Sequence, residues 1–195
     1  MGIRSARIEG RVQGMGLTNT SSRYGSLSIA MHWLMFLLLV AVYACIELRE
    51  FYPKGSDLRS ALKAWHFTLG LSVFALVWLR VGLHLFQVTP AIEPAPAPWQ
   101  NLLAKLVHLA LYALMVGMPL VGWLVLSGEG KPIPFWGLDL PALMGQNKEL
   151  AETLEDWHKT AGNVGYFLIG LHAVAALVHH YVQRDNTLTR MLPGR

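Results

Sequence analysis

The stretch TAGNVGYFLIGLHAVAALVHHYVQ, residues 160–183, runs for 24 positions without an Asp, Glu, Lys or Arg. Stretches 24–46 and 106–128 are equally free of these residue types for 23 positions each, and a fourth, 64–92, is interrupted only by Arg80. About 20 apolar residues, at about 1.5 Å rise per residue, cross the roughly 30 Å hydrocarbon core of a bilayer. The sequence therefore predicts an all-α fold, an integral membrane four-helix bundle.

The composition of the whole chain agrees with a membrane protein. Of 195 residues, 53% are hydrophobic and 14% charged, whereas soluble domains average about 45–50% apolar and roughly 25% charged residues. A single cysteine, Cys45, excludes an internal disulfide, a thiolate-held iron–sulfur cluster and covalent haem attachment through a Cys-x-x-Cys-His motif. The net charge is +4, but no basic stripe alternates with aromatic residues outside the spans. We therefore expect membrane lipid, and no nucleic acid, as a partner.

We expect one transmembrane domain, 24–195, with helices at about 25–47, 63–88, 100–127 and 156–183. Residues 1–23 are expected to be a tail. Its segment Ile8-Glu9-Gly10-Arg11 is typical of a protease-site linker added for expression, and a native disordered tail is an equally good interpretation. The Pro-rich connection 89–99 is short and stiff, which predicts that the second and third helices are antiparallel neighbours. The loop 127–155 is expected to cap the bundle.

The histidines are the candidates for the chemistry of this protein. All eight lie in the predicted spans or at their ends, namely His32, His66, His84, His108, His158, His172, His179 and His180. An ionisable side chain in hydrocarbon is costly and suggests a function, although any single one could be a satisfied interior group. His158 and His172 are 14 residues apart, nearly four turns, so they share one helix face about 21 Å apart. Antiparallel alternation then places His66 level with His158, and His32 level with His172.

Two facing imidazoles in an apolar bundle suit the axial positions of a haem iron. Zinc would normally take four ligands, often with Cys or a carboxylate among them, and neither depth offers such a residue inside the spans. The pattern therefore favours two bis-histidine b haems, and two filled axial positions favour electron transfer over oxygen binding. Arg80 follows His66 by 14 residues and is expected at the depth of His32, where it would bind a haem propionate or extend to the lipid headgroups.

Several short motifs resemble the bacterial di-haem cytochrome b561 family over about residues 24–193. The four family haem ligands fall on the same four histidines: His32 and His172 for a cytoplasmic-side haem, His66 and His158 for a periplasmic-side haem. The matching motifs are Ile29-Ala30-Met31-His32-Trp33, Trp65-His66, Trp78-Leu79-Arg80, Asp156-Trp157-His158-Lys159-Thr160, Asn163-Val164-Gly165-Tyr166-Phe167, Leu171-His172-Ala173, Ala176-Leu177-Val178-His179-His180-Tyr181, Asp185-Asn186-Thr187-Leu188 and Arg190-Met191.

The resemblance implies a multi-pass protein of the bacterial inner membrane with both termini in the cytoplasm. In particular, it implies a membrane oxidoreductase that oxidises superoxide to dioxygen at the periplasmic side and passes electrons through two haems b to ubiquinone. The charge count gives weak support for this orientation: nine Lys and Arg fall on the side of the termini and seven on the opposite side, and the more basic side normally faces the cytoplasm.

Three residues are candidates for contact with the two substrates. Lys63, one turn before His66, and Lys159, next to His158, are expected to attract the superoxide anion. Six acidic residues in the loop 127–155 and at the start of the last helix oppose that attraction, and contact with lipid headgroups is the ordinary role of such lysines. His179, two turns beyond His172 on the same stripe, is expected to hydrogen-bond or protonate a quinone carbonyl, because histidine titrates near neutral pH; its ordinary role is that of an interfacial histidine.

Two other functions remain open at this point. The chain could be a haem-b anchor and electron-transfer subunit of a larger quinone-linked oxidoreductase such as a nickel–iron hydrogenase, with a protein redox partner as electron donor. It could also be a histidine-lined transporter of metal ions or protons. Co-purification of a stoichiometric soluble subunit would favour the first of these, and a colourless purified protein the second.

Overall fold

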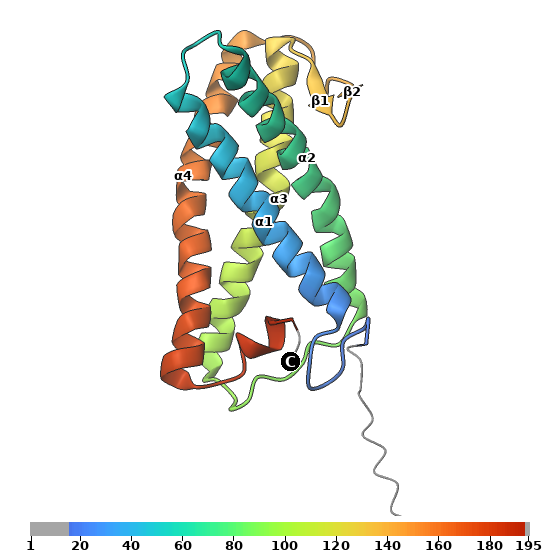
Figure 1. The fold of residues 1–195 in the computed structure, drawn as a ribbon, viewed down its shortest axis with the longest axis vertical. Helices are drawn as coiled ribbons and strands as arrows, with labels where there is room; N and C mark the ends of the chain where they lie inside the picture. The colour runs from blue at the N-terminus through green and yellow to red at the C-terminus, as the bar shows by residue number, and fades with distance from the viewer. Residues whose placement is uncertain (1–15, 194–195) are drawn as a thin grey trace, which may run out of the picture.

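The computed structural model describes residues 16–193, and four long helices account for most of them. They are α1 (Ser26–Leu48), α2 (Asp57–Phe86), α3 (Pro98–Glu129) and α4 (Lys148–Val178). Successive helices run in opposite directions along the long axis of the molecule (Figure 1). Each is long and apolar enough to cross a membrane, counting the short helical turn that continues α1 and α4. The prediction of an all-α membrane four-helix bundle is therefore confirmed.

Two helices begin earlier than expected because their capping residues lie in polar sequence. The Ser56 side chain accepts a hydrogen bond from the backbone N–H of Arg59 at 3.3 Å, so α2 begins at Asp57 rather than near residue 63. The Asn147 side chain likewise accepts from the N–H of Leu150 at 3.1 Å, and α4 begins at Lys148 rather than near 156. Such caps satisfy N–H groups that the first helical turn leaves unpaired. A criterion based on apolar runs does not detect these polar first turns.

The long connection before α4 is structured, but it lies beside the helices rather than across the end of the bundle (Figure 1). It contains two short antiparallel strands, β1 (Ile133–Phe135) and β2 (Leu138–Leu140). Trp136 in the tight turn between them has φ 50° and donates from its indole N–H to the Ser72 hydroxyl of α2 at 3.0 Å. The hairpin is therefore fastened to the side of α2 within its membrane-spanning part.

Two apolar clusters hold the bundle together. The first lies in the middle of the molecule and is formed by α1, α2 and α3, with buried members Met35, Val73, Val77 and Met115. The second joins α2, α3 and β1 near the hairpin, with buried members Leu71, Leu126 and Ile133. No buried member of either cluster comes from the described part of α4. The interior surface of α4 is therefore free to present other side chains toward α1 and α2.

Both ends of the described chain meet at one end of the bundle, which we call the termini end. The opposite end, with the hairpin, is the hairpin end (Figure 1). Of the expected tail 1–23, residues 1–15 and the segment Ile8-Glu9-Gly10-Arg11 lie outside the described residues. In the remainder, Asn19 binds the end of α2: its backbone N–H donates to Gln87 Oε1 at 2.8 Å, and its side-chain amide donates to the Val88 carbonyl at 3.0 Å.

Candidate functional site

The four histidines singled out by their spacing form two pairs between facing helices. The rings of His66 on α2 and His158 on α4 have centroids 6.2 Å apart, and those of His32 on α1 and His172 on α4 are 6.3 Å apart. Two imidazoles on opposite sides of one metal, with metal–nitrogen bonds of about 2.0–2.1 Å, have ring centres about 6 Å apart. Both separations fit a single iron between each pair. We call them the hairpin-side pair (His66, His158) and the termini-side pair (His32, His172).

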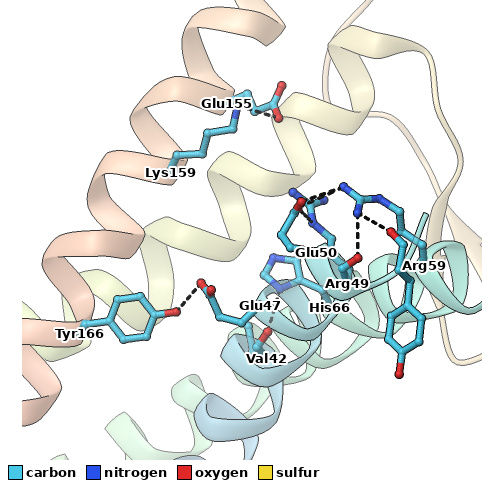
Figure 2. Close-up of polar contacts among 10 residues, drawn as sticks. Val42, Glu47, Arg49, Glu50, Arg59, His66, Glu155, Lys159 and Tyr166 are labelled. Atoms are coloured by element: carbon cyan, nitrogen blue, oxygen red, sulfur yellow. Dashed lines mark hydrogen bonds and ion pairs between the residues drawn. The ribbon is translucent and has the colours of Figure 1, made fainter. Parts of the chain in front are cut away.

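The hairpin-side pair has a ring that is already oriented for a metal. Nδ1 of His66 lies 3.0 Å from the backbone carbonyl oxygen of Val42 (Figure 2). A carbonyl oxygen only accepts hydrogen bonds, so Nδ1 carries the proton and the lone pair of Nε2 is free. Metal-binding histidines are commonly held in this way. Nδ1 of its partner His158 is buried and makes no hydrogen bond of ordinary geometry with the residues described.

A cavity of about 440 Å³ surrounds the hairpin-side pair, and residues of all four helices line it. This volume lies in the usual range for cofactor and ligand pockets, roughly 300–1,000 Å³. Two glycines help to keep it open. A Cβ at Gly70 would meet nothing within 4 Å, and a Cβ at Gly122 would lie 3.3 Å from Cε1 of the His158 ring. The cavity therefore has room for a group placed between the two rings.

Charged side chains line this cavity, and most of them are paired with one another or with a neighbouring charged residue (Figure 2). Glu50 binds both Arg49 and Arg59, each at 3.0 Å. Lys159 Nζ lies 3.1 Å from Glu155 and 3.6 Å from Asp156. Lys63 instead lies 5.7 Å from the centre of the Phe67 ring and, within the described part of the chain, forms no salt bridge. Both lysines proposed to attract superoxide thus line the cavity, but Lys159 is paired with carboxylates and Lys63 is not.

Two tyrosines connect α1 and α4 beside the same cavity: Tyr166, which lies in a family motif but had no predicted role, and Tyr43, which no sequence pattern indicated. Tyr166 on α4 donates to Glu47 at 2.7 Å, and Tyr43 on α1 donates to the carbonyl of Gly162 at 2.9 Å. Their rings are 4.3 Å apart. Each is an ordinary polar residue near the end of an apolar run, so nothing in the sequence alone indicates that the two meet. These contacts define the wall of the cavity between α1 and α4.

The termini-side pair has a different surrounding. Arg80 lies at the depth of His32, as the count along α2 predicts, and its Nη2 is 3.0 Å from Nδ1 of His32. A guanidinium only donates hydrogen bonds, so Nδ1 of His32 accepts and the proton of the neutral ring is on Nε2. Nε2 becomes available to a metal only after Arg80 leaves Nδ1. Once released, the same guanidinium would be free to bind a carboxylate such as a haem propionate.

A third histidine lies next to the termini-side pair. The ring of His108 on α3 is 5.2 Å from that of His172, which is too close for two ligands on opposite sides of one iron. Its Nδ1 lies 2.6 Å from the Ala104 carbonyl oxygen on the preceding turn. Among residues 16–193, no group of three or more His, Cys, Asp or Glu residues could hold a metal ion. A histidine pair suits an iron whose other ligands come from a porphyrin better than it suits a bare ion.

His179 lies at the termini end, where α4 passes into a π-helical turn, η2 (His179–Gln183). Its Nδ1 is 2.5 Å from Oδ2 of Asp185. Asp185 lies in one of the family motifs, but no role for it was predicted from the sequence. The reversal of the chain that brings it back to His179 has no signal in the apolar pattern.

Comparisons with known proteins agree with this arrangement. The family model described as prokaryotic cytochrome b561 matches residues 23–194. The chain is 37% identical to cytochrome b561 homolog 1 of Escherichia coli over 89% of its length and 99% of that protein. It is 39% identical to a probable superoxide oxidase, CybB, of Yersinia pestis over 89% of its length and 97% of that protein. A further relative, cytochrome b561 homolog 2 of Escherichia coli, is 31% identical over 91% of this chain and 95% of its own.

The matches cover all four helices and the histidine pairs between them. Four spans, two pairs of facing imidazoles and similarity along nearly the whole chain lead to one assignment. The chain belongs to the prokaryotic cytochrome b561 family of membrane haem-b electron-transfer proteins.

Proposed function

We propose that this protein is a di-haem superoxide:ubiquinone oxidoreductase. Electrons from superoxide enter at the hairpin end and leave to ubiquinone at the termini end. The proposal rests above all on the two histidine pairs with ring separations of 6.2 and 6.3 Å, at two depths of one bundle. The similarity to a probable superoxide oxidase, at 39% identity over almost its full length, supports the choice of electron donor.

The four paired histidines are the proposed axial ligands. His66 and His158 would hold one haem b, and His32 and His172 the other. Haem iron, when bound, supplies reversible one-electron transfer. The chain supplies the orientation of the rings, through contacts such as that of His66 with Val42. It also supplies the apolar cluster of Met35, Val73, Val77 and Met115 in the middle of the bundle.

Lys63 is the proposed contact for superoxide. Superoxide gives up one electron to become dioxygen, so the site has to attract an anion and release a neutral product. Lys63 lines the cavity beside His66 without a carboxylate partner among the described residues, and an unpaired cation in a half-enclosed space attracts anions most effectively. Lys159 is held by Glu155 and Asp156, so its contribution should be smaller.

His179 is the proposed contact for ubiquinone. Two superoxide anions supply the two electrons that convert one quinone to a quinol, and two protons are taken up in the same conversion. Histidine is the side chain that most often acts as a general acid or base in proteins. We propose that the termini end faces the cytoplasm of the bacterial inner membrane, which the count of nine Lys and Arg on that side against seven on the other supports; the protons of the quinol would then come from the cytoplasm.

Optical spectroscopy of the purified protein tests the proposal. We expect a reduced-minus-oxidised spectrum of b-type haem with about two haems per chain. A superoxide source alone should reduce the haem, and a short-chain ubiquinone should reoxidise it. Haem that only a co-purified protein can reduce would contradict the proposal and favour an anchor subunit of a larger oxidoreductase. A colourless protein would contradict any haem function.

A further inference from the structure

The backbone after α4 reverses sharply and returns the chain to His179. The helix widens into the π-helical turn η2, and the next residue, Arg184, has a left-handed conformation with φ 58°. The backbone N–H of Asp185 then donates to the His179 carbonyl at 3.1 Å. π-helical turns and left-handed non-glycine residues are uncommon and are found disproportionately at functional sites. The reversal places the carboxylate of Asp185 beside the imidazole six residues earlier.

The carboxylate of Asp185 is buried and held on both of its oxygens. Oδ2 lies 2.5 Å from Nδ1 of His179, and Oδ1 accepts from the backbone N–H of Thr187 at 2.9 Å. Its side chain is only 2% exposed, against 18% for His179. Burial alone would raise the pKa of Asp185, but the hydrogen bonds from His179 and Thr187 bring it below its ordinary value. A buried carboxylate with these partners is therefore ionised at neutral pH.

The rest of the C-terminal segment, 184–193, is tied to neighbouring parts of the termini end. Asn186 exchanges two hydrogen bonds with the backbone of Glu93, each 3.0 Å. Arg190 donates to the Pro90 carbonyl, and the indole of Trp33 donates to the Met191 carbonyl at 2.7 Å. The position of Asp185 is thus fixed from the connection 89–97 and from α1, independently of its bond to His179.

We propose that Asp185 is a positioning residue that keeps the His179 proton on Nδ1 and leaves Nε2 to face a quinone carbonyl oxygen. This inference rests on the proposed quinone role of His179. A carboxylate that accepts from one imidazole nitrogen determines the tautomer and the ring orientation. When the quinone takes up two electrons, one of its two protons passes from Nε2 of the imidazolium form to a carbonyl oxygen. The ring then returns to its neutral form with its remaining proton on Nδ1, still bound to Asp185; the second proton comes from water.

The simpler alternative is that Asp185 only fastens the C-terminal segment. Asn186→Ala is the matched control, because it removes a fastening contact to Glu93 one residue away and keeps the carboxylate. If fastening were the whole role, Asn186→Ala and Asp185→Asn would have equal effects. Asp185→Glu keeps the charge and is the conservative variant for rescue.

The test combines ¹⁵N NMR of histidine-labelled, full-length haem-loaded protein with kinetics. The His179 signals are assigned by their loss in His179→Gln. In the wild type we expect a neutral ring protonated on Nδ1, and in Asp185→Asn a mixture of tautomers. We expect kcat for reduction of a short-chain ubiquinone to fall about tenfold to a hundredfold in Asp185→Asn, with KM changed less, as for loss of an oriented proton donor. Superoxide-driven haem reduction should stay within about twofold, Asn186→Ala should be close to wild type, and Asp185→Glu should recover part of the rate.

Three results would overturn the inference. The first is a neutral His179 ring that carries its proton on Nε2 in the wild-type protein. This result overturns the inference even if Asp185→Asn fails to fold, because it needs no variant. A ring that keeps its Nδ1 proton in Asp185→Asn removes the positioning role, whatever the kinetics. A changed tautomer with unchanged quinone kinetics shows that Asp185 orients a histidine that does not serve the quinone. Failure of the proposed function itself is a separate observation, because His179→Gln would then also leave quinone reduction unchanged.

Discussion

The two histidine pairs have almost the same ring separation, 6.2 and 6.3 Å, yet their surroundings differ. At the hairpin-side pair, a backbone carbonyl keeps the His66 proton on Nδ1, and a cavity of about 440 Å³ lies beside the rings. At the termini-side pair, the Arg80 guanidinium donates to Nδ1 of His32. His66 of the first pair is thus ready to bind a metal through Nε2, whereas His32 of the second pair must first exchange its contact with Arg80.

The two pairs differ in the groups that hydrogen-bond to their histidines, not in the type of residue that would bind the metal. A carbonyl and a guanidinium impose opposite proton positions on an imidazole. Equal spacing therefore does not make the two sites equivalent. We expect haem to bind first, and faster, at the hairpin-side pair.

The largest effect should follow from removing one member of a pair. His66→Ala should reduce the haem content from about two per chain to about one, because a single imidazole no longer fills both axial positions. The haem-to-protein ratio measures this, and His108→Ala is the matched control that should keep both haems. Loss of both haems from a folded His66→Ala protein would show that the two sites are not independent.

Haem titration of the cofactor-free protein compares the two pairs directly. We expect a fast phase from the hairpin-side pair and a slower one from the termini-side pair. Arg80→Gln should accelerate the slow phase about tenfold to a hundredfold, because a contact equivalent to a charged hydrogen bond, about 1.5–3 kcal/mol, no longer has to break. Stopped-flow absorbance measures both phases. An unchanged slow phase in Arg80→Gln would mean that Arg80 does not control entry to this site.

A smaller effect is expected at the mouth of the hairpin-side cavity. Lys63→Gln should slow superoxide-driven haem reduction about threefold to tenfold and weaken its dependence on ionic strength, because a cation that attracts superoxide is lost. Lys159→Gln should change the rate by less than about twofold, since Glu155 and Asp156 already neutralise that charge. Pulse radiolysis at several salt concentrations measures both variants. Equal effects of the two would refute the distinction between them.

The smallest effect concerns acid stability at the termini end. The folded-state pKa of Asp185 is lowered, despite burial, by hydrogen bonds from His179 and Thr187. Its ionised form therefore stabilises the fold above the ordinary pKa of 3.8, and this contribution is lost as the pH falls through the lower folded-state value. Between about pH 5 and pH 3 the melting temperature of wild type should drop further than that of Asp185→Asn. If the melting temperatures of the two proteins fell equally between about pH 5 and pH 3, the lowered pKa of Asp185 would be contradicted.

The parts of the fold that follow from local periodicity were predictable from the sequence. Charge-free runs identify the four spans, and the 14-residue interval from His158 to His172 places both rings on one face of α4 because 14 residues make nearly four turns. The same count puts Arg80 at the depth of His32. The starts of α2 and α4 were misplaced because Ser56 and Asn147 cap them within polar sequence.

The contacts that distinguish the two pairs could not be predicted in this way. The bond of His66 to the Val42 carbonyl and that of Arg80 to His32 depend on which rotamer each side chain adopts between packed helices. The meeting of His179 with Asp185 depends on the left-handed backbone of Arg184. None of these three contacts produces a periodic pattern in the sequence. These three contacts determine which nitrogen of each histidine carries the proton. The depth and pairing of the histidines can therefore be predicted from the sequence, but the protonated nitrogen cannot.

Both histidine pairs take one member from α4, and α4 is synthesised after α1, α2 and α3. A nascent chain in which only these first three helices have been inserted holds one histidine of each pair, so, if the pairs bind haem as proposed, neither site is complete at that stage. On this proposal, haem binding and completion of the four-helix bundle occur together, after α4 is inserted. We therefore expect a polypeptide truncated before residue 148 to bind no haem.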